Sequence, residues 1–86
     1  MFLKKEVTMA SFEVRVVNDD QKGLKGVRVR LSFKGLTRGM SSEEYTDSDG
    51  SAYFDGYEKG DITVYIDGRD YGSYYYVDGG SITVTK

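Results

Sequence analysis

An unbroken alternation of apolar and polar residues from Val27 to Lys34 is the feature that most constrains how this chain can fold. The segment reads Val-Arg-Val-Arg-Leu-Ser-Phe-Lys, so every second side chain is apolar. Successive side chains of a β-strand point to opposite faces, and a period of two is therefore typical of a strand with one face in a core and the other in water. The segment predicts a half-buried strand and does not favour a helix.

Shorter segments repeat this alternation and are separated by turn signals. Apolar and polar residues alternate in 12–16, 62–66 and 82–84. Asp-Gly pairs supply the positive φ that tight hairpin turns need, and their regular recurrence predicts short antiparallel strands rather than a βαβ repeat. The turn signals are Asp49-Gly50, Asp55-Gly56, Lys59-Gly60, Asp67-Gly68 and Asp78-Gly79. We predict seven strands, at about residues 11–17, 26–34, 43–47, 51–55, 61–67, 71–77 and 81–85.

These strands predict an all-β fold, a seven-stranded antiparallel Greek-key β-sandwich. The chain has 86 residues, enough for one domain with one core. Each large apolar side chain that is fully buried contributes about 1.5–3 kcal/mol, so a core of this size offsets much of the entropy lost on folding. The side chains expected to point inward are Phe12, Val14, Val16, Leu24, Val27, Val29, Leu31, Phe33, Ala52, Phe54, Ile62, Val64, Ile66, Val77, Ile82 and Val84.

The first residues are expected to lie outside this domain. We interpret residues 1–8 as an N-terminal extension that need not be ordered, and residues 9–86 as the single sandwich domain. Lys5-Glu6-Val7 can be encoded by AAG-GAG-GTN, which spells a bacterial ribosome-binding site, and Met9 follows at a distance suitable for initiation. In the alternative interpretation, apolar residues of the extension lengthen the first strand. The sequence leaves both open.

Composition excludes several classes of function. The chain contains neither cysteine nor histidine, which removes disulfides, thiolate nucleophiles, zinc sites built on sulfur or imidazole, and the usual general base of serine hydrolases. We therefore predict that the chain is not an enzyme and uses no cofactor and no metal. A formal charge of −2 makes nucleic acid an unfavourable partner. No segment is typical of a signal peptide or of membrane insertion, and by default we expect a cytoplasmic or virion-associated protein.

Four segments carry a resemblance to a known family. They are the first strand, the corner at 18–29 (Asn-Asp-Asp-Gln-Lys-Gly-Leu-Lys-Gly-Val-Arg-Val), the turn at 46–54 (Thr-Asp-Ser-Asp-Gly-Ser-Ala-Tyr-Phe) and the strand at 60–64 (Gly-Asp-Ile-Thr-Val). Together they resemble carboxypeptidase-regulatory-like and Cna B-type domains over residues 12–84. The resemblance implies a prealbumin-like, that is transthyretin-like, Greek-key sandwich of Ig-like architecture. The family usually has a proline in the corner where this chain has Leu24-Lys25.

The tyrosines are the candidate partner-binding residues. Alternation along the sixth predicted strand places Tyr74 and Tyr76 on one face and Tyr75 on the other, so at least one tyrosine must point outward. Tyrosine is enriched at binding hot spots and can stack on sugars. The alternative is ordinary aromatic pairing that shields a small sheet. The predicted surface consists of Tyr65, Tyr71, Tyr74, Tyr75 and Tyr76.

Two charged groups have a structural and a functional interpretation. Asp47, Asp49 and Asp55 surround Gly50 and could hold a divalent ion weakly, but a β-turn with solvated carboxylates is favoured because the spacing does not complete a calcium loop. The other group, on the outward faces of the first two strands, is interpreted as a solvated face with cross-strand charge pairing rather than a nucleic-acid site. It consists of Arg15, Arg28, Arg30 and Lys34.

These observations favour a non-catalytic structural or protein-binding module, an accessory part of a larger bacterial or viral assembly. Two alternatives stay open. The first is a carbohydrate-binding module that uses exposed tyrosines. The second is a small acidic inhibitor protein of viral origin, in which carboxylates near the turns imitate a row of phosphates. The partner and the oligomeric state do not follow from the sequence.

Overall fold

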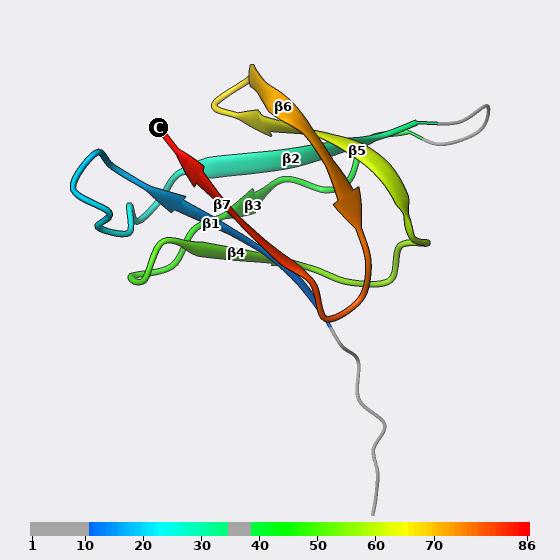
Figure 1. The fold of residues 1–86 in the computed structure, drawn as a ribbon, viewed down its shortest axis with the longest axis horizontal. Helices are drawn as coiled ribbons and strands as arrows, with labels where there is room; N and C mark the ends of the chain where they lie inside the picture. The colour runs from blue at the N-terminus through cyan, green and yellow to red at the C-terminus, as the bar shows by residue number, and fades with distance from the viewer. Residues whose placement is uncertain (1–10, 35–38) are drawn as a thin grey trace, which may run out of the picture.

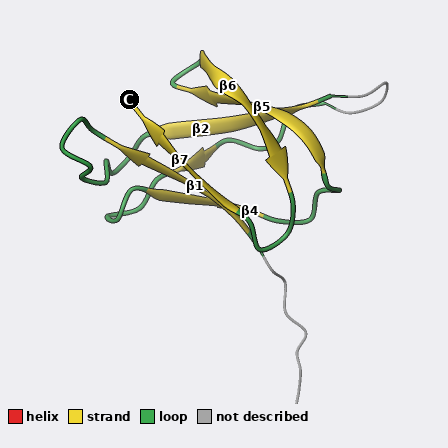
Figure 2. Ribbon diagram, in the orientation of Figure 1, coloured by secondary structure: helices red, strands yellow, loops and turns green. Residues whose placement is uncertain are grey.

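Seven strands form two sheets that pack against each other in the computed structural model, which describes residues 11–34 and 39–86 (Figures 1 and 2). The seven predicted strands are confirmed, with ends that differ by at most two residues. The predicted extension, residues 1–8, lies outside the described residues. The strands are β1 (Phe12–Val17), β2 (Arg28–Phe33), β3 (Glu44–Tyr45), β4 (Ser51–Phe54), β5 (Gly60–Ile66), β6 (Arg69–Tyr76) and β7 (Ser81–Thr85).

The strand order is β4-β1-β7 in one sheet and β3-β2-β5-β6 in the other. The prediction of a purely antiparallel sandwich is wrong, because β1 and β7 pair in parallel. Every antiparallel pair between the described strands joins an odd-numbered strand to an even-numbered one, whereas β1 and β7 are both odd-numbered. This pattern arises when each connection reverses the chain, so that the first and the last strand run in the same direction once they become neighbours.

The core lies between the sheets and follows the alternation of the sequence. In the central pair of the larger sheet, Val29 lies opposite Ile66 and Leu31 opposite Val64, and all four side chains are fully buried. Most of the predicted inward residues are buried as expected. Leu24 and Ile82 are only partly buried.

Val77 was predicted to point inward and instead has an exposed fraction of 42%. The prediction is wrong because β6 ends at Tyr76, which takes the inward position and is completely buried. Its ring centroid lies 4.9 Å from that of Phe12 on β1 and 5.4 Å from that of Phe33 on β2, so this tyrosine bridges the two sheets. Its hydroxyl donates a hydrogen bond to the carbonyl oxygen of Phe54 at 3.3 Å.

A close backbone contact fixes the corner between β1 and β2. A Cβ atom added to Gly23 would lie 2.0 Å from the carbonyl oxygen of Asp49, so only glycine fits there. The hydroxyl of Thr46 accepts a hydrogen bond from the Val27 amide at 2.8 Å and donates one to the carbonyl oxygen of Leu24. The corner is thereby tied to the segment that leaves β3.

Candidate functional site

The outer face of the four-stranded sheet brings together arginine and tyrosine side chains from three strands. Arg28 and Arg30 are the outward residues at the start of β2. Tyr45 on β3 lies opposite Arg28, and Tyr65 on β5 lies opposite Arg30. Cross-strand partners share a face and their side chains are neighbours. We call this set of four residues the Arg–Tyr face.

A hollow of about 370 Å³ opens on this face. The loop before β3 forms one wall, and the hairpin turn between β5 and β6 forms another. Its floor is the outer side of β2. The lining residues are Arg28, Arg30, Ser32, Met40, Glu43, Tyr65 and Gly68.

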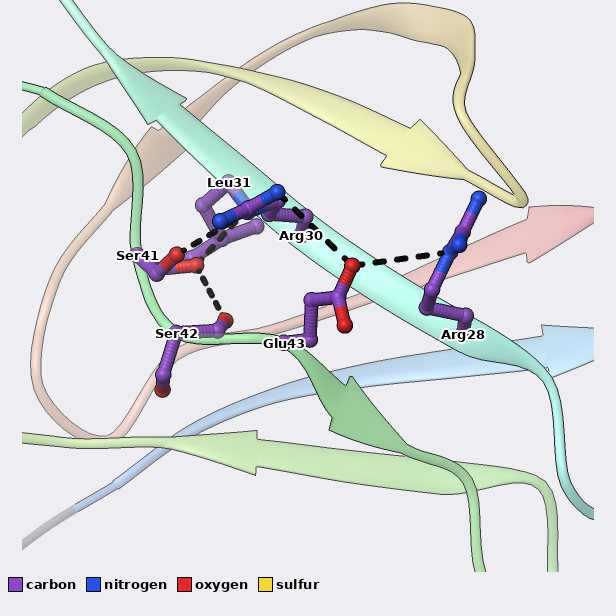
Figure 3. Close-up of polar contacts among 6 residues, drawn as sticks. All are labelled: Arg28, Arg30, Leu31, Ser41, Ser42 and Glu43. Atoms are coloured by element: carbon purple, nitrogen blue, oxygen red, sulfur yellow. Dashed lines mark hydrogen bonds and ion pairs between the residues drawn. The ribbon is translucent and has the colours of Figure 1, made fainter.

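Ser41 holds the loop wall of the hollow against β2. This buried residue accepts a hydrogen bond from the Leu31 amide through its hydroxyl oxygen at 2.9 Å, and its hydroxyl donates to the carbonyl oxygen of Ser42 at 2.8 Å (Figure 3). The carbonyl oxygen of Ser41 accepts a hydrogen bond from Nε of Arg30 at 3.2 Å. The guanidinium of Arg30 is therefore held in place by the same residue that anchors the loop.

Glu43 lies between the two guanidinium groups. Its Oε2 atom is 3.8 Å from Nε of Arg28 and 3.7 Å from Nη1 of Arg30. Figure 3 shows both ion pairs as dashed lines that meet at Glu43. A charge-assisted hydrogen bond between nitrogen and oxygen is about 2.7–2.9 Å long, so both contacts are ion pairs without a hydrogen bond. One carboxylate is thus shared loosely by two arginines.

The hairpin turn between β5 and β6 lies near the guanidinium of Arg28. Asp67 and Gly68 form a two-residue turn with φ values of 52° and 84°, the left-handed conformation that the Asp-Gly pair predicted. A Cβ atom added to Gly68 would lie 3.3 Å from Nη2 of Arg28. Glycine at this turn therefore leaves room for the arginine head.

Asp67, beside this site, has a partner of its own. Its Oδ2 atom lies 2.8 Å from Nζ of Lys86. The hydrogen bond from Lys86 is the largest cause that lowers the pKa of Asp67 below its ordinary value of 3.8. The charge of Arg28 is a smaller cause of the same lowering, so Arg28 also lies within the field of Asp67. Glu43 is the carboxylate that forms an ion pair with both Arg28 and Arg30 within the described residues.

The outer face of the three-stranded sheet carries similar residues in a different arrangement. A larger hollow of about 470 Å³ is lined there by Glu13, Arg15 and Tyr53, among other residues. The hydroxyl of Ser51 donates a hydrogen bond to Glu13, and Nε of Arg15 donates one to the carbonyl oxygen of Asp49 at 3.2 Å. The charged side chains of this face are thus hydrogen-bonded separately, and no carboxylate is shared between two arginines within the described residues.

The predicted tyrosine surface is divided by the sheet. Tyr65 and Tyr75 lie on its outer face, and Tyr75 has an exposed fraction of 52%. Tyr71 and Tyr74 are half-buried and pack against the core. Tyr76 is completely buried in the core and cannot contact a partner, so the prediction that it belongs to this surface is wrong.

Burial also changes the chemistry of Tyr76. Loss of solvent around its hydroxyl is the main cause that raises the pKa of Tyr76 above 10.0. The alternation argument correctly separated Tyr75 from Tyr74 and Tyr76, but it did not indicate which face was the inner one.

The predicted basic group is also divided. Arg15 lies on the three-stranded sheet, whereas Arg28 and Arg30 lie on the four-stranded sheet, so they do not form one stripe. The expected charge pairing is present for Arg28 and Arg30 through Glu43. The sequence signal for that pairing was weak, because Glu43 precedes β3 and its position depends on how the loop folds back.

Of the three carboxylates predicted around Gly50, that of Asp47 stabilises the turn between β3 and β4. Oδ1 of Asp47 accepts hydrogen bonds from the amides of Asp49 at 2.9 Å and Ser51 at 3.0 Å. Gly50 has a φ of 87°, as expected for this turn. Across residues 11–34 and 39–86, no three or more carboxylates gather as metal ligands do. In the same residues, no helix has the length and hydrophobicity needed to cross a membrane.

Comparison with models of known protein families gives no match, and no curated protein is significantly similar to the chain. The function of the protein is therefore inferred from the geometry of the Arg–Tyr face.

Proposed function

We propose that this chain is a non-catalytic protein-binding module and that the Arg–Tyr face is its binding surface. The observation that carries the proposal is the placement of two arginines and two tyrosines from three strands on one face, where Arg28, Arg30 and Tyr65 line a hollow and Tyr45 lies beside Arg28. Arginine and tyrosine are the residue types that, with tryptophan, most often dominate the energy of protein interfaces. Tyr45, with an exposed fraction of 59%, offers a large amphipathic surface beside the charged groups.

We also propose that the fold is a transthyretin-like Greek-key sandwich, as the resemblance to carboxypeptidase-regulatory-like and Cna B-type domains implies. The strand orders β4-β1-β7 and β3-β2-β5-β6 support this over the immunoglobulin arrangement, in which strands one, two, five and four share a sheet. A fold does not define a function, so the partner must be argued from the surface.

Carbohydrate binding has less support from the positions of the exposed tyrosines. Tyr45 and Tyr75 lie on the two edge strands of the four-stranded sheet, and these strands are three spacings or about 14 Å apart. The register adds to their separation, because Tyr45 lies beside the start of β2 and Tyr75 lies level with its end. Tyr53 lies on the other sheet. No pair of these three rings can stack on one sugar ring. An acidic inhibitor has less support because Glu43, Asp47 and Asp67 interact within the chain.

The test compares matched variants of the two outer faces. One variant carries Arg28→Gln and Tyr45→Ala, and the control carries Arg15→Gln and Tyr53→Ala on the three-stranded sheet. Each immobilised protein is incubated with an extract of the source organism, and the bound proteins are identified by mass spectrometry. We expect one partner that binds the wild type and the control and is lost from the first variant, with all three proteins folded by circular dichroism. Equal loss from both variants would contradict the proposal.

A further inference from the structure

We propose that the hollow of the Arg–Tyr face binds an acidic side chain, Asp or Glu, of the partner protein, and that Glu43 occupies this site in the free chain. The inference rests on the proposed function and names the chemistry of the group that is recognised. Arg28 and Arg30 present guanidinium groups to one point, and that point holds a carboxylate oxygen (Figure 3). A planar guanidinium with several N–H donors matches a carboxylate in geometry as well as in charge.

The contacts of Glu43 with the two arginines are long, and this leaves hydrogen bonds that a carboxylate of the partner can form. Both arginine nitrogens lie 3.7–3.8 Å from the same oxygen of Glu43, so neither forms a hydrogen bond there. Of the contacts within the described chain, Arg30 uses only Nε in a hydrogen bond, to Ser41. The terminal nitrogens of both arginines can therefore donate to a carboxylate that enters the hollow at hydrogen-bond distance.

One of the two guanidinium groups is positioned before a ligand arrives. Arg30 is held by the carbonyl oxygen of Ser41, whose hydroxyl is bonded to β2. Arg28 has the looser ion pair with Glu43 at 3.8 Å. A group that is already ordered loses less side-chain entropy on binding, so the fixed position of Arg30 favours a site over two freely moving surface arginines.

The charges around the hollow favour a single acidic side chain over a polyanion. Asp70 lies opposite Tyr65, and Asp61 lies opposite Tyr75, so both carboxylates are on the same outer face as the arginines. A nucleic acid that crossed this face would meet them and be repelled. A peptide can place one carboxylate between the arginines and rest apolar atoms on Met40, whose exposed fraction is 50%.

The test is a nuclear magnetic resonance titration of the whole chain at low salt with an acetylated and amidated Ala-Leu-Glu-Ala peptide, which carries a single acidic side chain. We expect saturable shifts of the Nε–H signals of Arg28 and Arg30, and none with the matched peptide in which glutamine replaces the glutamate. Arg30→Gln should weaken binding about tenfold through loss of charge-assisted hydrogen bonds. Glu43→Gln should tighten binding about two- to fivefold, because it removes the internal competitor. Arg15→Gln on the other sheet is the control and should leave the affinity unchanged.

Three results would overturn the inference: no saturable shift at Arg28 and Arg30, weaker binding by Glu43→Gln, or tighter binding of inorganic phosphate or a dT4 oligonucleotide than of the peptide. The capture experiment separates this failure from failure of the proposed function. If the captured partner is lost with Tyr45→Ala but retained with Arg30→Gln, the face binds protein without an acidic anchor. If the peptide binds while no captured protein depends on the face, the site exists and the proposed function is wrong.

Discussion

The inner and outer faces of the four-stranded sheet come from the same strands and carry opposite kinds of side chain. On β2, the inner residues Val29 and Leu31 are fully buried, whereas the outer residues Arg28 and Arg30 surround a hollow. Alternation therefore places core residues and residues of the proposed binding surface at neighbouring positions of one strand. Substitutions on the inner face should change the free energy of unfolding, and substitutions on the outer face should change binding with little effect on stability.

Tyr76 and Tyr75 test this difference between the two faces most directly, because they are adjacent in the chain and chemically identical. Tyr76→Ala should lower the free energy of unfolding by about 3–5 kcal/mol, since it leaves a cavity between Phe12 and Phe33. Tyr75→Ala, at an exposed position, should change it by less than about 0.5 kcal/mol. Urea unfolding followed by circular dichroism measures both values. Comparable losses would show that the two faces do not differ in this way.

A second prediction concerns polar groups inside the sandwich. Thr46→Val keeps the shape of the side chain and removes the hydroxyl that bonds to Val27 and Leu24. The buried amide of Val27 then loses a partner, and we expect a loss of about 1–3 kcal/mol in the same unfolding measurement. Ser42→Ala, which removes an exposed hydroxyl bonded to Glu44, is the control and should have little effect. If Thr46→Val left the free energy of unfolding unchanged, water would have to replace the hydroxyl as the partner of the Val27 amide.

Alternation predicted the strands and most of the core because burial on one side of a sheet is a local property of the sequence. It did not predict that β1 and β7 are parallel, since the order of strands in a sheet depends on contacts far apart in the chain. It also did not identify Tyr76 as a core residue. Three consecutive tyrosines carry no polarity difference, so the pattern there cannot distinguish inside from outside.

A bulge in β6 is a second reason why the pattern does not indicate which tyrosines point inward. Gly72 has a φ of 113°, and the register with β5 shifts between Thr63 and Tyr65. An extra residue of this kind exchanges the faces of all positions that follow it. The sequence predicted the Arg–Tyr face only in part. It indicated that the arginines point outward, but the position of Glu43 between them depends on how a loop folds.

Removal of the Tyr76 hydroxyl should lower the free energy of unfolding less than Thr46→Val does, and its effect should depend on pH. Because burial raises its pKa above 10.0, the folded state holds the proton more tightly than the unfolded state. This contribution to stability is present below pH 10 and is lost as the pH rises through the folded pKa. Tyr76→Phe should cost about 0.5–1.5 kcal/mol at pH 7. It should also lose less stability than the wild type between pH 9 and about pH 11 in urea unfolding, and an equal loss would contradict the prediction.

The smallest predicted effect lies beside the Arg–Tyr face, at the ion pair between Asp67 and Lys86. Because the pKa of Asp67 is lowered in the folded state, its carboxylate contributes stability above pH 3.8, and this contribution is lost as the pH falls through the folded pKa. Both side chains are more than one-third exposed, so solvent screening limits the effect to a few tenths of a kcal/mol, or about 0.2–0.5. Asp67→Asn should remove this part of the acid dependence, and 1 M salt should reduce it in the wild type. Arg28 is a smaller cause of the lowered pKa of Asp67, and an effect several times larger would mean that the attraction between Asp67 and Arg28 is strong enough to make the hollow less available to an acidic partner.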